Sequence, residues 1–184
     1  MPGGSWLFPP AWAFPPAAQT LANPLPAVVL TGDELDVRSG EWLPHTAAGS
    51  TVGQSVIRLG AHVGFKTLNV VRRRSAVEDI LALRGTAVIC TEDEDLHERV
   101  ADIAGHGGAS KAIDCVSGEV GADVSLELAP HGELVVYDAR PRTAKPIPTN
   151  SRPDLRALID VSPRFYVGAS RCSLRCVAVG LLLP

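Results

Sequence analysis

From residue 42 onward, short apolar runs alternate with amphipathic stretches along most of the chain. The apolar runs predict strands, because aliphatic and β-branched residues cluster in them, and the intervening stretches carry apolar positions at helical spacing. The predicted strands are 42–47, 67–71, 87–90, 112–116 and 134–137, and the predicted helices are 51–62, 75–84, 94–104 and 119–128. This alternation favours right-handed βαβ units, so the predicted fold class is α/β with a doubly wound parallel sheet.

Several element boundaries have a local signal. In the first long helix, apolar residues recur at helical spacing and are expected to face the sheet: Val52, Val56, Leu59 and Val63. Gly64 stands where a C-cap glycine is preferred, Ser75 is the expected N-cap of the next helix, and Gly85 ends it. The acidic run 92–95 opens the third helix and is expected to be solvated charge favoured by the helix dipole. Pro44 falls inside the first strand, where its missing N–H is disfavoured.

Both ends of the chain have a different pattern. Seven of the fifteen prolines lie within the first 26 residues, so we expect little regular structure there, and a short helix from Gln19 should be interrupted by Pro24 and Pro26. Beyond residue 138, further prolines imply an extended loop, then a short helix at 154–159 and apolar stretches at 165–167 and 177–183 that form strands or pack as a tail. The predicted division is a proline-rich irregular arm (1–18), a single domain (19–168) and an apolar tail (169–184).

Composition narrows the function classes. The formal net charge of −3 argues against a general nucleic-acid binder. No run is long and apolar enough to span a membrane, and the start lacks the charged region of a signal peptide, so we expect no membrane partner and a cytoplasmic location.

Cys90 and Cys115 lie in apolar runs and are expected to be buried, reduced thiols. Cys172 and Cys176 have no further ligands beside them, so no metal site is predicted. The histidines (His45, His62, His97, His106 and His131) are scattered and are expected to be structural or surface residues.

The candidate chemistry lies in a small-residue turn and a basic triplet. Residues 46–53 (TAAGSTVG) connect the first strand to the first long helix, where a dinucleotide pyrophosphate would meet backbone N–H groups and the helix dipole. About 20 residues later, where an NAD-preferring Rossmann-type fold carries an acidic residue, this chain has Arg72, Arg73 and Arg74. Guanidinium groups can grip a 2′-phosphate, so NADP(H) is the predicted cofactor. The alternative is a solvated basic cluster at a strand end.

Five separated segments, in order, resemble the medium-chain dehydrogenase/reductase superfamily, and specifically its zinc-independent quinone reductase and 2-enoyl thioester reductase branch. They are 23–27 (NPLPA), 46–53 (TAAGSTVG), 65–72 (FKTLNVVR), 114–118 (DCVSG) and 134–137 (LVVY). The resemblance implies that Ser50, Thr51 and Val52 lie against the pyrophosphate. It implies that Arg72, Arg73 and Arg74 hold the adenosine phosphate, and that Cys115, Val116 and Tyr137 line the nicotinamide side. Ser117, His131 and Asp138 stand where this family usually has glycine.

The resemblance implies an NADP(H)-dependent oxidoreductase that transfers hydride to a conjugated carbonyl of a small-molecule substrate, and pairing of two copies through the sheet edge. It covers only the cofactor-binding domain, roughly 19–137, whereas the family's catalytic tyrosine belongs to a β-rich substrate domain. We therefore expect a truncated member and assign no catalytic residue. A non-catalytic remnant that binds a nucleotide, or a Rossmann module that binds a partner, is the alternative.

Overall fold

A computed structural model of the protein describes residues 24–105, 107–137 and 156–159. Six strands form one parallel sheet in the order β3-β2-β1-β4-β5-β6. Their bounds are β1 (Trp42–His45), β2 (Lys66–Val71), β3 (Ala87–Cys90), β4 (Ala109–Asp114), β5 (Leu128–Val136) and β6 (Arg156–Ile159). The chain winds outward from β1 in one direction as far as β3 and then returns to β4 on the other side of β1. This reversal confirms the predicted doubly wound α/β fold.

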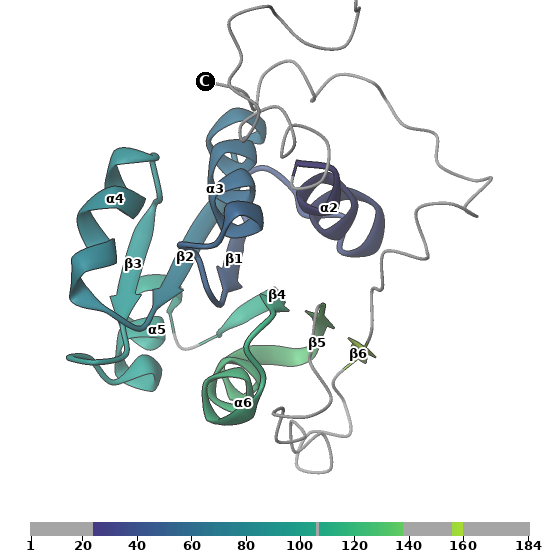
Figure 1. Cartoon of the computed structure of the whole chain (residues 1–184). Coiled ribbons are helices and arrows are strands. Elements are labelled where there is room, and N and C mark those ends of the chain that lie inside the picture. The colour runs from purple at the N-terminus through teal and green to yellow at the C-terminus, as the bar shows by residue number, and fades with distance from the viewer. Residues whose placement is uncertain (1–23, 106, 138–155, 160–184) are drawn as a thin grey trace, which may run out of the picture.

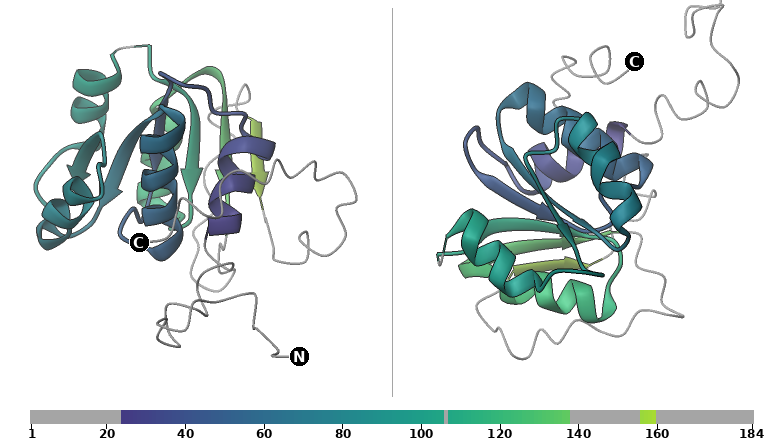
Figure 2. Two further views of the ribbon diagram at one scale, coloured as in Figure 1. Left: turned by 90° about the horizontal axis from the view of Figure 1, so that it is seen from above. Right: turned by 90° about the vertical axis from the view of Figure 1, so that its left-hand side faces the viewer.

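Helices cover both faces of the sheet (Figures 1 and 2). Their bounds are α2 (Pro24–Val28), the π-helical η1 (Val29–Glu34), α3 (Thr51–Val63), the 3₁₀ turn η2 (Arg74–Ala76), α4 (Val77–Ala82), α5 (Leu96–Ala104) and α6 (Gly118–Leu126). One face carries α2, α3 and α4, and the other carries α5 and α6. Neighbouring residues of β5 accordingly enter different clusters, with Val135 packed beside α3 and Leu134 and Val136 packed beside α5 and α6.

The first βαβ unit follows its sequence signals closely. Helix α3 begins at Thr51 as predicted and ends at Val63, followed by Gly64 with φ of +97° in the expected C-cap position. Val56 and Leu59 are buried against the sheet, and Val52 packs beside them. Val63 is 46% exposed, so its predicted place on the sheet-facing side is wrong. Ile57, outside the predicted stripe, is fully buried beside Val71 and Ile80, so the buried face of α3 is wider than predicted.

Two helix starts differ from the prediction. Ser75 lies within the 3₁₀ turn η2 and does not cap α4, whose N-cap is Ala76 without a side-chain bond. Helix α5 begins at Leu96 rather than at residue 94, because the side chain of Asp95 accepts a hydrogen bond from the N–H of Glu98 and so acts as the N-cap. Helix α4 ends at Ala82 with Leu83 as its C-cap, so the predicted end at Gly85 is wrong. The N–H of Gly85 donates to the carbonyl of Ile80 in the turn that follows the helix.

Pro24 and Pro26 lie within helix α2 and do not interrupt it, whereas the predicted helix start at Gln19 lies outside the described residues. Pro24 and Pro26 lie in the first turn of α2, where backbone N–H groups have no partner within the helix, so nothing is lost. The α2–η1 segment packs on α3 through Ala27 and Leu30, both fully buried. The residues before Pro24 lie outside the described part of the chain.

The last two strands correct the sequence prediction most strongly. The predicted helix at 154–159 is wrong, because Arg156–Ile159 pairs in parallel with β5. Strand β5 also begins six residues earlier than expected, at Leu128, and its pairing with β4 is irregular near Ala109. The Pro130–Gly132 stretch inside β5, with His131 at φ of +62°, accounts for the turn-like appearance of the sequence. The apolar stretches at 165–167 and 177–183, and Cys172 and Cys176, lie outside the described residues.

Pro44 is accommodated where two strands share little backbone pairing. Strand β1 pairs with β2 over four residues, but with β4 only at His45 and Ile113. The alternation along a strand turns the nitrogen of Pro44 to the same side as the amide of Thr46, which donates to the Ile113 carbonyl in β4. Its missing N–H therefore falls in the shortest ladder of the sheet.

Candidate functional site

The turn between β1 and α3 is built for close backbone approach. Ser50 is the N-cap of α3, and its hydroxyl oxygen accepts a hydrogen bond from the N–H of Gly53 at 3.1 Å. The N–H of Ser50 donates to the carbonyl of Ala47 at 2.8 Å, and Ala47 adopts a left-handed φ of +48°. A Cβ at Gly53 would lie 2.7 Å from the carbonyl oxygens of Ala47 and Ala48. Glycine thus lets the first turn of α3 sit directly on the connecting loop.

The turn leaves the N-terminus of α3 facing outward. Thr51 is exposed and Val52 half-buried, and Gly49 has no heavy atom within 4 Å of the position that a Cβ would occupy. The first N–H groups of a helix have no partners within it and attract anions. The predicted pyrophosphate contacts Ser50, Thr51 and Val52 all lie in this first turn or at its cap.

All three predicted arginines follow β2, but they differ in their surroundings. Arg72, Arg73 and Arg74 are exposed. Arg74 Nη1 donates to Asp93 Oδ2 at 2.8 Å, and the Arg74 N–H donates to Glu92 at 3.4 Å. The hydrogen bond to Asp93 and the negative charge of Asp93 raise the pKa of the Arg74 guanidinium above its ordinary value.

The acidic run 92–95 is therefore not simply solvated charge, as the sequence prediction had it. Besides the bonds to Arg74 and the cap from Asp95, Glu94 accepts a hydrogen bond from the N–H of Cys90 at 2.9 Å and pairs with Arg99. Burial of Cys90 agrees with the prediction of a reduced core thiol, and Cys115 is half-buried. The acidic run fixes the loop after β3 against the loop after β2.

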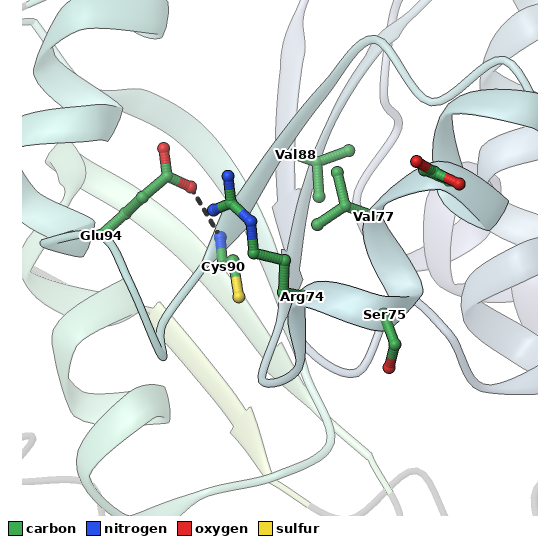
Figure 3. Close-up of a pocket in the computed structure, with 7 residues that line it drawn as sticks. Arg74, Ser75, Val77, Val88, Cys90 and Glu94 are labelled. Atoms are coloured by element: carbon green, nitrogen blue, oxygen red, sulfur yellow. Dashed lines mark hydrogen bonds between the residues drawn. The ribbon is translucent and has the colours of Figure 1, made fainter.

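A pocket of about 670 Å³ opens between these two loops (Figure 3). Figure 3 shows Val77 and Val88 forming an apolar wall, with the Arg74 side chain extending beside Cys90 and Glu94. The residues that line the pocket are Arg74, Ser75, Val77, Glu78, Val88, Cys90 and Glu94. Of the three predicted arginines only Arg74 lines it. A flat, mostly apolar ring with polar edges fits such a wall, and Arg74 offers a cation at its rim.

The third group of predicted residues follows β4 and β5. Cys115 is half-buried, Val116 is 50% exposed, and Tyr137 packs beside the core cluster of α2 and α3. The N–H of Tyr137 donates to the carbonyl of Asp114 at 2.9 Å. The N–H of Cys115 donates to the hydroxyl of Thr46, and Thr46 is the first residue of the turn before α3. The turn and the residues predicted for the nicotinamide side therefore meet at the carboxyl ends of β1, β4 and β5, while the arginines lie beyond β2 on the same edge.

Two residues in this region were not singled out from the sequence. Asp114 is fully buried and Thr46 is 2% exposed, and their side chains share a hydrogen bond of 2.7 Å. A charged residue at the end of an apolar strand is an available sequence signal, because a buried carboxylate requires partners. Within the described ranges, His, Cys, Asp and Glu side chains form no group of three or more that could hold a metal ion.

Comparison with known proteins finds similarity to reductases. The mitochondrial enoyl-[acyl-carrier-protein] reductase of Schizosaccharomyces pombe is 30% identical over 149 residues, which span 75% of this chain and 40% of that protein. The Dictyostelium discoideum protein of the same name is 31% identical over 135 residues, which span 70% of this chain and 38% of that protein. The chain belongs to the medium-chain dehydrogenase/reductase superfamily. The match covers the cofactor-binding part, and the chain spans about 40% of the length of these curated relatives. No protein-family model matches it.

Solved structures agree with this superfamily. A Bacillus thuringiensis structure assigned as an NADPH:quinone reductase superposes with a TM-score of 0.78 at 26% identity, over 86% of this chain and 48% of the other. The Escherichia coli quinone oxidoreductase complexed with NADPH gives a TM-score of 0.78 at 21% identity, over 88% of this chain and 50% of the other, and shares the fold.

The location of the protein stays a prediction. The curated relatives carry the word mitochondrial in their names, whereas the sequence alone favoured the cytoplasm. In the part of the chain that the structure describes, no helix has the length and apolar character needed to cross a bilayer.

Proposed function

We propose that this chain is the NADP(H)-binding part of a reductase of the quinone or enoyl thioester type. The observation that carries the proposal is the turn before α3, where Gly53 permits close packing and Ser50 caps the helix, at the carboxyl end of β1 in a doubly wound sheet. Open α/β sheets bind ligands in the crevice outside the carboxyl ends of their strands, where the strand order reverses. The similar solved structures include one assigned as an NADPH:quinone reductase and a quinone oxidoreductase complexed with NADPH.

Each part of the cofactor has a proposed partner. The pyrophosphate lies against Ser50, Thr51 and Val52 at the N-terminus of α3. The adenosine enters the pocket between the loops after β2 and β3, with its 2′-phosphate at the arginine triplet (Arg72–Arg74). The nicotinamide lies beside the loop after β4 and near Tyr137.

NADPH would supply the hydride, and the conjugated carbonyl of a quinone or 2-enoyl thioester would accept it. The contribution of this chain is to bind and orient the cofactor. The exposed side chain of Val116 and the half-buried Cys115 form the surface on which the nicotinamide ring is held. We assign no catalytic residue to the described part of the chain.

Cofactor titration tests the proposal. We expect the 184-residue chain to bind NADPH more tightly than NADH. Because hydrogen bonds to charged groups contribute about 1.5–3 kcal/mol, Arg74→Ala should weaken NADPH binding about 10- to 100-fold and leave NADH binding nearly unchanged. Arg72→Ala should act in the same direction. Arg38→Ala is a matched control, since Arg38 is an exposed cation that precedes β1, at the opposite end of the strands. Failure of the wild-type chain to bind either cofactor would reject the proposal.

Turnover separates an enzyme from a binding module. NADPH absorbance should fall when a quinone or a 2-enoyl thioester is added to the loaded protein, if the polypeptide that carries this domain also carries the substrate site. Binding without oxidation of NADPH would favour the alternative of a nucleotide-binding module.

We also propose that two copies pair at the sheet edge formed by β6. Among the described strands β6 is the last in the sheet order, and an edge strand presents unpaired backbone groups to a neighbour. Sedimentation equilibrium should then give the mass of a dimer, and a monomer at all concentrations would contradict this pairing.

A further inference from the structure

A buried polar cluster joins two loops at the carboxyl edge of the sheet. Asp114 ends β4, and Thr46 follows β1. The hydroxyl of Thr46 donates to Asp114 Oδ1 at 2.7 Å and accepts a hydrogen bond from the N–H of Cys115 at 2.9 Å. One hydroxyl therefore uses both its donor and an acceptor site across the boundary between β1 and β4.

The carboxylate of Asp114 is held from several directions. Its Oδ1 also accepts from the N–H of Val116 at 3.0 Å, and its Oδ2 accepts from the N–H of Ser117 at 2.9 Å. A Cβ at Gly121 of α6 would lie 2.5 Å from Oδ2, so the helix packs directly against the carboxylate. Because Asp114 is fully buried and these bonds turn it inward, it acts on a ligand only through the two loops that it holds.

The buried polar cluster lies between β1 and β4, beside the crevice where a ligand is expected to bind. Strands β1 and β4 are the pair at which the strand order reverses, and an extended ligand in this crevice contacts the loops that follow both strands. The backbone ladder between these strands consists of a single residue pair, so it fixes the spacing of their loops weakly. The bonds of the Thr46 and Asp114 side chains link the two loops at the ligand end, and the Cys115 thiol adds a long bond of 3.9 Å to the Thr46 carbonyl.

We propose that Asp114, acting through Thr46, is a positioning residue that sets the distance between the turn 46–53 and the loop 115–117. The inference rests on the proposed function, because it concerns how those loops hold the pyrophosphate and nicotinamide parts of NADPH. A ligand that spans both loops depends on their spacing. A ligand confined to the pocket beside Arg74 does not.

The test compares two ligands on three proteins. Thr46→Val removes the hydroxyl but keeps the shape of the side chain, and Thr46→Ser keeps the hydroxyl and is the matched control. NADPH spans the crevice, whereas 2′-AMP carries only the adenosine and the 2′-phosphate. Since bonds to a charged acceptor are involved, Thr46→Val should weaken NADPH binding about tenfold and change 2′-AMP binding by less than about twofold. Thr46→Ser should bind both ligands as the wild type does.

The outcomes distinguish this inference from the proposed function. If the wild type binds neither ligand, the proposed function fails, and the inference falls with it. If the wild type binds both and Thr46→Val binds NADPH equally well, or loses both ligands to the same extent, the positioning role is overturned while the cofactor site stands. If Thr46→Val does not fold, Asp114→Asn gives the deciding measurement. It keeps the volume but replaces one acceptor by a donor facing the N–H of Ser117, and an equal loss of both ligands would again overturn the inference.

Discussion

Replacing Ser117 by glycine should stabilise the protein. Ser117 precedes α6 with φ of +59° and ψ of −163°, a backbone region that is essentially restricted to glycine. Holding another residue there costs about 1–3 kcal/mol. The serine side chain makes no capping hydrogen bond to α6. The bond to Asp114 uses the main-chain N–H of residue 117 and remains available in the variant.

The expected gain is smaller than the full strain, because glycine also gives the unfolded chain more freedom. That freedom opposes folding by roughly 0.5–1 kcal/mol. The free energy of unfolding should therefore rise by about 1 kcal/mol in Ser117→Gly. For a domain of this size such a gain raises the melting temperature by about 2–4 °C.

Urea unfolding followed by circular dichroism measures this gain. The midpoint for Ser117→Gly should move to higher urea with an unchanged slope, since the surface exposed on unfolding does not change. Ser117→Ala is the matched control, because alanine lacks the hydroxyl but keeps the Cβ and hence the strain. The reasoning fails if Ser117→Gly is no more stable than the wild type. It also fails if Ser117→Ala gains as much, because the hydroxyl would then be the cause.

Three further predictions concern other positions. Burial lowers the pKa of His45 to about 4, so on acidification the imidazole is protonated in the unfolded state before it is protonated in the folded state. Between pH 6.5 and about 4 the free energy of unfolding should therefore fall by roughly 3 kcal/mol in total. Urea midpoints measured across this range should fall less steeply in His45→Gln. Gly53→Ala should destabilise the protein by about 1–3 kcal/mol and weaken NADPH binding, whereas Gly49→Ala, where a Cβ meets nothing, should leave urea midpoint and titration unchanged. The hydrogen bond to Glu127 raises the pKa of His97, so this contact contributes stability at acidic pH that is lost as the pH rises through that pKa; an NMR titration should show the pKa of His97 falling in Glu127→Gln, and an unchanged pKa would refute the assignment.

Helix and strand boundaries that depend on nearby residues, such as a C-cap glycine, could be predicted from the sequence. Strand β3 has the predicted bounds, and α3 ends within one residue of its predicted end because Gly64 supplies the C-cap. The segment 156–159 could not be predicted in the same way. Its backbone forms a strand because β5 offers a parallel partner, and such pairing overrides the preference of a short segment.

The same distinction holds for the candidate site. The turn before α3 and the arginine triplet can be recognised from the sequence, because their residue types and their spacing follow the demands of a pyrophosphate and a 2′-phosphate. The pairing of Asp114 with Thr46 joins residues 68 positions apart, and that of Arg74 with Asp93 joins residues 19 positions apart. Both pairings follow from the order of the strands, which the local pattern of the chain does not specify.

Pro44 lies at a seam in the sheet, where the backbone ladder between β1 and β4 is short. Strands β1, β2 and β3 form one half and β4, β5 and β6 the other, with one backbone residue pair between them. Side chains close the seam at both ends. Lys111 Nζ donates to the Asp36 carbonyl at 2.6 Å and to Glu41 at 2.9 Å, and Thr46 closes the other end. Core clusters still join the two sides, so we expect only the backbone bond from Thr46 to Ile113 to open before the longer ladders, and amide hydrogen exchange at Thr46 reports that opening. A dinucleotide bound across the crevice would also hold the loops after β1 and β4 together. It should therefore slow hydrogen exchange at amides between these strands that it does not contact.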